Sequence, residues 1–199
     1  MQRLFFGAIS ALALLISSPS AAQENALSDF YIGLYGGYTW MDADNDNGAD
    51  PEPEGFDYGL FGGYRIDSMF ANTNYGLTGA LEAFIGGSTA DDEIGGVDIE
   101  KGLEYGFSFR PGFAFLNQNA FNINPYGIIG YRNTELEASS GGLSTDENYH
   151  GFELGLGADI LQLDNNIGVR AEYSYVWYME DNDIDPSEGN LRLGLSYQF

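Results

Sequence analysis

The side chains that could carry out catalysis are few in this sequence. The only histidine is His150, and no serine lies within two residues of it. Hydrolysis by a serine nucleophile needs a base beside the hydroxyl group and an acid beside the base, and the sequence offers no such set of positions. Cysteine is absent, so the chain forms neither a disulfide nor a thiolate metal site. We therefore predict that the protein is not an enzyme and has no catalytic residue.

Carboxylates are the one abundant reactive group, because 30 Asp and Glu stand against seven Lys and Arg. Aspartate recurs at alternate positions in two polar segments: Asp42, Asp44, Asp46 in the first and Asp181, Asp183, Asp185 in the second. The first triplet, followed by Gly48 and Glu54, is similar to the calcium loop of an EF-hand, although the glycine and the glutamate each lie one place too late. We expect these aspartates to bind calcium weakly, with a hydrated acidic surface as the alternative, and we expect no other cofactor.

The acidic excess amounts to a formal net charge of −23. Such a chain repels a phosphate backbone, which excludes nucleic acid as a partner and favours a cationic surface ligand. Most acids fall in four polar segments that we expect to be long loops: 41–55, 88–96, 137–148 and 180–189. The segments 117–122 and 164–166 predict short turns. The segment 67–75 is long for a turn, so a flanking strand is expected to extend into it.

Between these segments, apolar and polar residues alternate at period two, which is typical of β-strands with one apolar and one polar face. In the last segment, Leu191 and Leu193 share one face, and Asn190 and Arg192 share the other. Pro111 lacks a backbone donor, so the strand that contains it is expected to bend or end there. We predict eight strands of about the 9–11 residues that a tilted membrane-spanning strand requires: 30–40, 56–66, 76–87, 97–110, 123–136, 151–160, 169–177 and 189–199.

An even number of strands lets the last strand pair antiparallel with the first, which closes a barrel and removes both edges. The composition agrees, because 28 glycines and 14 each of Phe and Tyr are typical of β-sheet proteins. The predicted fold is all-β, an eight-stranded antiparallel up-and-down transmembrane β-barrel.

The N-terminal residues 1–22 have the order of a cleaved signal peptide. Arg3 supplies a positive charge, residues 4–16 are apolar, and residues 20–22 are the small residues of a cleavage site. The apolar part is shorter than the ~20 residues of a membrane-spanning helix. We therefore predict a signal peptide over residues 1–22 and one barrel domain over residues 23–199.

Charged residues within the predicted strands fall on the polar face. A charge that faces lipid near the bilayer midplane costs about 2–4 kcal/mol, so the charged face should line the lumen. An eight-stranded barrel is only wide enough for side chains to fill it. We therefore predict a salt-bridged plug that includes Asp57, Glu100 and Asp159 and, as its main members, Arg65, Glu82, Glu104, Arg110, Arg132, Glu153, Arg170, Glu172 and Arg192. A narrow porin-like channel for small solutes or ions is the alternative.

The C-terminal residues Arg192, Gly194, Tyr197 and Phe199 resemble the assembly signal of bacterial outer-membrane proteins. Residues 23–199 as a whole resemble the family of small eight-stranded outer-membrane barrels, which includes the membrane domain of outer-membrane protein A, outer-membrane protein X and opacity-type proteins. The resemblance implies a place in the outer membrane of the Gram-negative envelope. Outer-membrane lipid, lipopolysaccharide and the barrel-assembly machinery are then the expected partners. It also implies a structural or surface-interaction role at the cell surface, which the acidic loops would carry.

Deletion of Phe199 is expected to leave secretion intact and to impair insertion, because its ring completes the assembly signal that the resemblance implies. Heat-modifiable gel migration of outer-membrane fractions measures the folded band. A normal yield of that band from the deletion variant would contradict a role of Phe199 in assembly.

Overall fold

The computed structural model describes residues 27–45, 52–70, 74–94, 96–117, 121–140, 143–162, 164–179 and 184–199. Within these ranges the chain forms nine strands: β1 (Leu27–Asn45), β2 (Glu54–Met69), β3 (Tyr75–Ser88), β4 (Asp91–Ile94), β5 (Val97–Asn117), β6 (Phe121–Ser140), β7 (Leu143–Gln162), β8 (Ile167–Tyr178) and β9 (Ile184–Gln198). No helix in the described part of the chain is long and apolar enough to cross a membrane. The predicted signal segment 1–22 lies outside the described residues.

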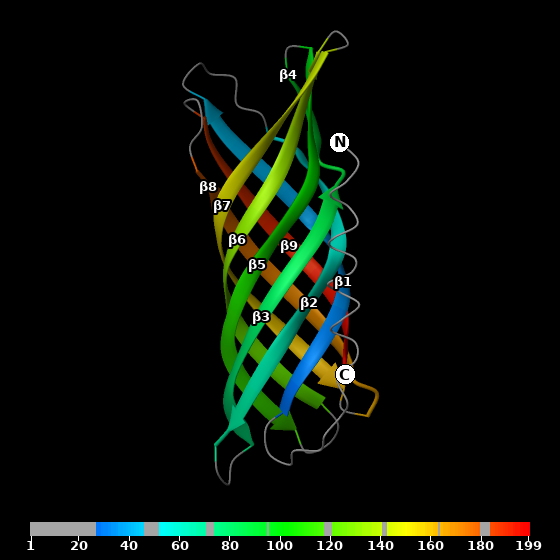
Figure 1. Ribbon diagram of the computed structural model, residues 1–199, viewed down its shortest axis with the longest axis vertical. Helices are drawn as coiled ribbons and strands as arrows, with labels where there is room; N and C mark the ends of the chain where they lie inside the picture. Colours follow the sequence, from blue (N-terminus) through cyan, green and yellow to red (C-terminus); the bar gives the residue numbers. More distant parts are fainter. Residues whose placement is uncertain are drawn as a thin grey trace, which may run out of the picture.

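Eight of these strands close into an antiparallel barrel in up-and-down order, as the sequence predicts (Figure 1). The cylinder is closed by β1 and β9, which pair from Tyr31↔Gln198 to Asn45↔Ile184. Closure satisfies backbone groups within the barrel wall, which strands must achieve before they can cross a bilayer. The short β4 is the exception, because it lies in the segment 88–96 that we expected to be a loop. It pairs with both β2 and β5, so it continues the position of β3 between those two strands.

Side chains alternate between the two faces of the wall, in agreement with the period-two pattern. Outward positions carry large apolar side chains that remain exposed, such as Phe107 at 64%, Leu156 at 71% and Leu193 at 64%. Inward positions carry charged residues, tyrosines and glycines. Soluble proteins rarely leave so much apolar surface in water, so this outer wall requires lipid around it.

The prediction that a strand ends at Pro111 is wrong, because β5 runs from Val97 to Asn117. The other expected outcome, a bend at this position, stays a prediction. Pairing with β3 continues through Gly79↔Pro111. On the other side, the pairing with β6 is interrupted between Phe109↔Ile129 and Gly112↔Tyr126, where the proline has no N–H to donate. The strand persists because one intact ladder holds it in place.

The strands also extend beyond their predicted ends into the segments that we expected to be long loops. β1 runs to Asn45, β6 ends at Ser140, β7 begins at Leu143, and β9 begins at Ile184. Outside a membrane both faces of a sheet are solvated, so the apolar half of the alternation is lost although the backbone pairing continues. Periodicity alone therefore underestimates these strands.

The opposite end of the barrel has short connections, namely 70–74, 118–120 and 163–166. The first of them agrees with the expectation that a strand extends into the segment 67–75. In the last one, Asn166 adopts a left-handed conformation with φ 59°, which asparagine tolerates in tight turns. We refer to this end as the turn side and to the other end as the loop side.

One irregularity changes which side chains face inward. The register between β5 and β6 shifts between Lys101 and Glu104, as a β-bulge does. As a result Lys101 and Glu104, which are three positions apart, are both buried inside the barrel, with 2% and 0% exposure. Glu100, which we expected to face inward, is exposed on the outer face. The bulge thus exchanges an inward carboxylate for an inward ammonium group.

Candidate functional site

The interior of the barrel collects the positive charge of the protein. Apart from Arg3, every Lys and Arg of the sequence is buried there: Arg65, Lys101, Arg110, Arg132, Arg170 and Arg192. The carboxylates that ion-pair with them are Asp57, Glu82, Glu104, Glu153, Asp159, Glu172 and Glu188. These groups come from inward positions of the wall, where the period-two alternation of each strand places them. They form two separate networks.

The network on the turn side contains the bases Arg65, Arg110 and Arg170 and the acids Glu82, Asp159 and Glu172. Arg170 Nη1 lies 2.7 Å from Glu82 Oε2, and its Nε lies 3.1 Å from Asp159 Oδ1. Arg110 Nη2 lies 2.6 Å from Glu82 Oε1. Arg65 pairs with Asp159 and Arg110 with Glu172. Three bases face three acids, so this network is electrically neutral.

The network on the loop side is centred on Lys101. Its Nζ lies 2.9 Å from Glu188 Oε1, 3.1 Å from Asp57 Oδ2 and 3.1 Å from Glu104 Oε2. The ligand atoms of these three carboxylates lie within 4.8 Å of one another, a spacing that could hold a metal ion. Because the ammonium group lies among them and donates to them, the positive charge that such a cluster needs comes from the chain itself.

Two arginines complete the loop-side network. Arg132 lies 2.6 Å from Glu153 Oε1 and 3.2 Å from Glu104 Oε2. Arg192 Nη2 lies 2.6 Å from Glu104 Oε1 and 2.7 Å from Asp57 Oδ2. Together with Lys101 these are three bases for four acids, so the loop-side network carries one excess negative charge.

No ion pair between the described residues connects the two networks. Phe61 lies midway along β2 between Asp57 of one network and Arg65 of the other, and its ring is buried. The guanidinium carbon of Arg170 lies 4.0 Å from the centre of the Phe61 ring on the turn side. Those of Arg132 and Arg192 lie 5.0 Å and 5.6 Å from the centre of the Phe84 ring on the loop side. The two rings therefore form an apolar layer against which cations of both networks pack.

Tyrosine hydroxyl groups donate hydrogen bonds to inward glutamates, in addition to the ion pairs that these glutamates form. Tyr31, Tyr35, Tyr126 and Tyr178 donate to Glu82, Glu104, Glu172 and Glu188, at 2.9, 2.6, 2.6 and 2.5 Å respectively. The Tyr35 ring reaches its acid because Gly59 and Gly86 leave room, since a side chain at either position would collide with it. Buried charge is tolerated only when its hydrogen bonds are satisfied, and these phenols supply the missing donors.

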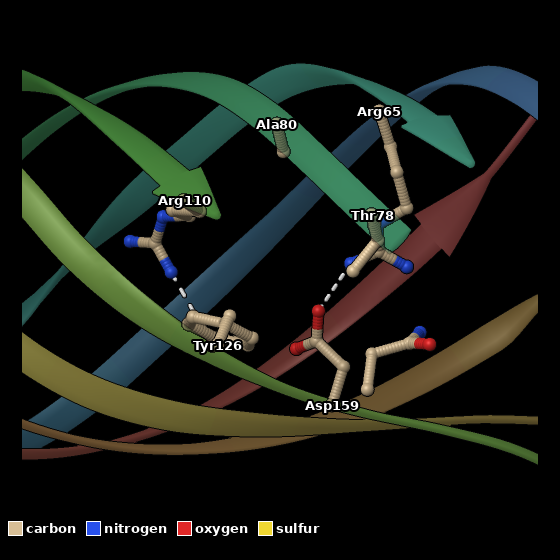
Figure 2. Close-up of a pocket in the computed structure, with 7 residues that line it drawn as sticks. Arg65, Thr78, Ala80, Arg110, Tyr126 and Asp159 are labelled. Atoms are coloured by element: carbon tan, nitrogen blue, oxygen red, sulfur yellow. Dashed lines mark hydrogen bonds and ion pairs between the residues drawn. The ribbon is translucent and has the colours of Figure 1, made fainter. Parts of the chain in front are cut away.

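A small cavity lies within the turn-side network (Figure 2). Arg110 reaches Tyr126 on one side of it, and Arg65 reaches Asp159 on the other, as the dashed lines in Figure 2 mark. Its volume is ≈ 10 Å³, which is room for about one water molecule. The cavity is lined by both charged and uncharged side chains of the lumen.

The main members of the predicted plug all lie inside the barrel and in ion pairs. Two participants were not predicted. Lys101 was missed because the bulge shifts the alternation at that point. Glu188, which is fully buried, lies in a segment that we expected to be a loop. The one signal in the sequence was that Lys101 is the single lysine and lies within the predicted strand 97–110.

The predicted calcium ligands are only partly described. Asp46, Asp181 and Asp183 lie outside the described residues. Asp42 is exposed near the loop-side end of β1. The backbones of Asp44 and Asp185 are direct partners in the ladder of β1 and β9. The described residues of the two triplets therefore lie on neighbouring strands of the barrel.

The remaining residues singled out in the sequence lie at the two rims. Tyr197 and Phe199 are exposed on the outer face with ring centres 5.2 Å apart, whereas Arg192 and Gly194 face inward. His150 is exposed, its Nδ1 lies 2.6 Å from Asn133 Nδ2, and its ring stacks on Tyr131. The contacts of the histidine are thus an amide and an aromatic ring.

The sequence matches the family model described as outer membrane protein beta-barrel domain over residues 8–199. A search of the curated proteins finds no significant match. Among solved structures, neisserial surface protein A aligns with 17% identity and a TM-score of 0.51, over 85% of this chain and 97% of that one. A major outer membrane protein of Thermus thermophilus aligns with 14% identity and a TM-score of 0.51, over 87% and 100%. Ail, the attachment invasion locus protein of Yersinia pestis, has 21% identity and a TM-score of 0.44, over 89% and 100%.

Replacement of Lys101 by Met is expected to lower the free energy of unfolding by about 3–5 kcal/mol, because it leaves three buried carboxylates without their shared cation. Arg170→Met is expected to do the same in the turn-side network. Urea unfolding of the refolded barrel in lipid measures both effects. Leu193→Met on the outer face is the matched control and should leave the midpoint unchanged. An unchanged midpoint for Lys101→Met would mean that water or ions replace the ammonium group.

Proposed function

Because this chain belongs to the outer membrane protein β-barrel domain family and lies in the bacterial outer membrane, we propose that it is a non-catalytic structural or surface-interaction protein. The observation that carries the proposal is the separation of charge. Apart from Arg3, every Lys and Arg is used inside the barrel, so the loop side presents acids with no Lys or Arg beside them among the described residues. The interior then has a structural task, and the loop side is the surface for partners.

The packed interior supports a structural task. A conducting pore needs a continuous polar path from one end to the other. Here the layer of Phe61 and Phe84 separates the two ion networks, and the ion pairs hold the charged side chains across the lumen. The alternative of a narrow porin-like channel would require both obstacles to move.

The acids of the loop side support a cationic surface ligand. Five neighbouring strands contribute one exposed acid each to a single row, in which each residue is the direct ladder partner of the next: Glu54, Asp91, Glu100, Glu137 and Asp146. Like charges directly opposite each other destabilise a sheet. A cationic ligand relieves this repulsion and gains affinity from it.

The apolar outer wall supports contact with outer-membrane lipid, including lipopolysaccharide in the outer leaflet. Phe107, Leu156 and Leu193 belong to this surface. Insertion by the barrel-assembly machinery is part of the same proposal. We assign the contact with this machinery to two outward rings, that of Tyr197 on β9 and that of Phe199, which follows β9.

The refolded protein is expected to give no stable single-channel currents in planar lipid bilayers, because Phe61 and Phe84 close the lumen. The double variant Phe61→Ala, Phe84→Ala should admit small cations, since the loop-side network has one excess negative charge. Phe107→Ala on the outer wall is the matched control. Regular current steps from the unmodified protein would favour the channel instead.

Calcium is expected to bind the loop side weakly, in the ~10⁻⁴–10⁻³ M range typical of extracellular sites with oxygen ligands. The candidate ligands are the two aspartate triplets, of which Asp42 and Asp44 lie on β1 and Asp185 lies on β9. Calorimetric titration of the refolded barrel tests this, with Asp42, Asp44 and Asp46 changed together to Asn as the comparison. Heats that do not saturate, or equal binding by the triple variant, would favour a merely hydrated surface.

A further inference from the structure

Among the described residues, the sheet on the loop side has a free edge along the first part of β7. Residues 143–149 pair with β6, from Ser140↔Leu143 to Thr134↔Tyr149. On its other side, β7 begins to pair with β8 only at Gly151↔Tyr178. No strand in the described ranges pairs with that side of residues 144–148. Figure 1 shows this part of β7 rising with β6 to the top of the view, beside β4.

The hydrogen bond next to this edge identifies which backbone groups point outward from it. The carbonyl oxygen of His150 accepts from the N–H of Met179 at 2.8 Å, so the backbone groups of His150 point toward the β8 side. In an antiparallel ladder the N–H and C=O of one residue point the same way, and successive residues alternate. Ser144, Asp146 and Asn148 therefore direct their N–H and C=O groups to the unpaired side. These groups can bond to one further strand.

The charge around the edge restricts what that strand can be. Asp146 is exposed and lies directly opposite Glu137, which lies directly opposite Glu100. Glu147 is exposed on the other face of β7. An acidic segment would be repelled, and so would the same edge of a second copy of this chain. A basic segment would neutralise the row of acids and pair with the backbone at the same time.

We propose that residues 144–148 of β7 receive an extended, basic segment of a partner protein, which adds to the sheet as a further strand. The inference rests on the proposed surface-interaction role and names the chemistry of the partner. Main-chain hydrogen bonds to Ser144, Asp146 and Asn148 supply the affinity, as in other cases of strand addition. Lys or Arg at alternate positions of the incoming strand, on the face of Asp146 and Glu137, supplies the selectivity.

The probe is a short peptide of alternating Lys and Val, added to the full barrel refolded in lipid nanodiscs. A peptide of alternating Glu and Val is the charge control. Amide hydrogen exchange by NMR should slow by about tenfold or more at Ser144, Asp146 and Asn148 in the saturated complex, because their N–H groups become bonded. The acidic peptide should neither bind nor protect these amides.

Variants separate strand addition from simple attraction of charge. Asn148→Pro removes one free-side N–H and leaves the β6 ladder intact, so it should weaken the Lys–Val peptide by about tenfold relative to Asn148→Ala. Ser144→Pro makes the same test if Asn148→Pro does not fold. Asp146→Asn should weaken binding and reduce its salt dependence while the amides remain protected at saturation.

Two outcomes would overturn the proposed strand addition. Absence of binding by the Lys–Val peptide is one. Binding without protection of the edge amides, or equal binding by the Pro and Ala variants, is the other.

If the peptide and spermidine then bind alike, the acidic surface still attracts cations and the proposed surface role stands without the edge. Current steps in planar bilayers would instead count against the proposed function and leave the strand addition to be judged by the exchange data.

Discussion

The penalty for exposing a charge to lipid is the constraint on which the rest of this structure depends. Each strand alternates between an apolar outer face and a polar inner face, and the barrel closes so that its first and last strands also pair in the wall. Charged side chains within the wall therefore point toward the lumen. Apart from Arg3, all the bases of the chain are gathered in this way into the lumen, together with the acids that pair with them.

The lumen is narrow, so these charges must satisfy one another instead of water. Ion pairs take the place of water in two ways. Lys101 lies among three carboxylates, and Arg170 pairs with Glu82 and Asp159. Tyrosines complete the hydrogen bonds, and the apolar layer of Phe61 and Phe84 keeps the two networks apart. The charged side chains of such a lumen are held by one another across the barrel.

On the loop side the constraint of the bilayer no longer applies. The strands continue to pair, but their outer face turns from apolar to acidic, and like charges accumulate there because the bases are all used inside. Among the described residues the ring also ceases to be closed there, since β7 extends with β6 beyond the start of its pairing with β8. The same division of charge that stabilises the lumen thus leaves an acidic, partly unpaired sheet facing outward.

The sequence by itself determined the barrel, its eight membrane strands and the main members of the polar interior, because the lipid penalty acts on every strand separately and is visible in local alternation. A strand end at Pro111 and an inward Glu100 were predicted wrongly, and Lys101 and Glu188 were missed. These positions depend on pairing between strands: a neighbouring ladder carries β5 past its proline, and a bulge in register reverses the phase after Lys101. Only the tertiary structure decided how the charges divide into two networks and where an edge stays free, since both follow from register between distant strands.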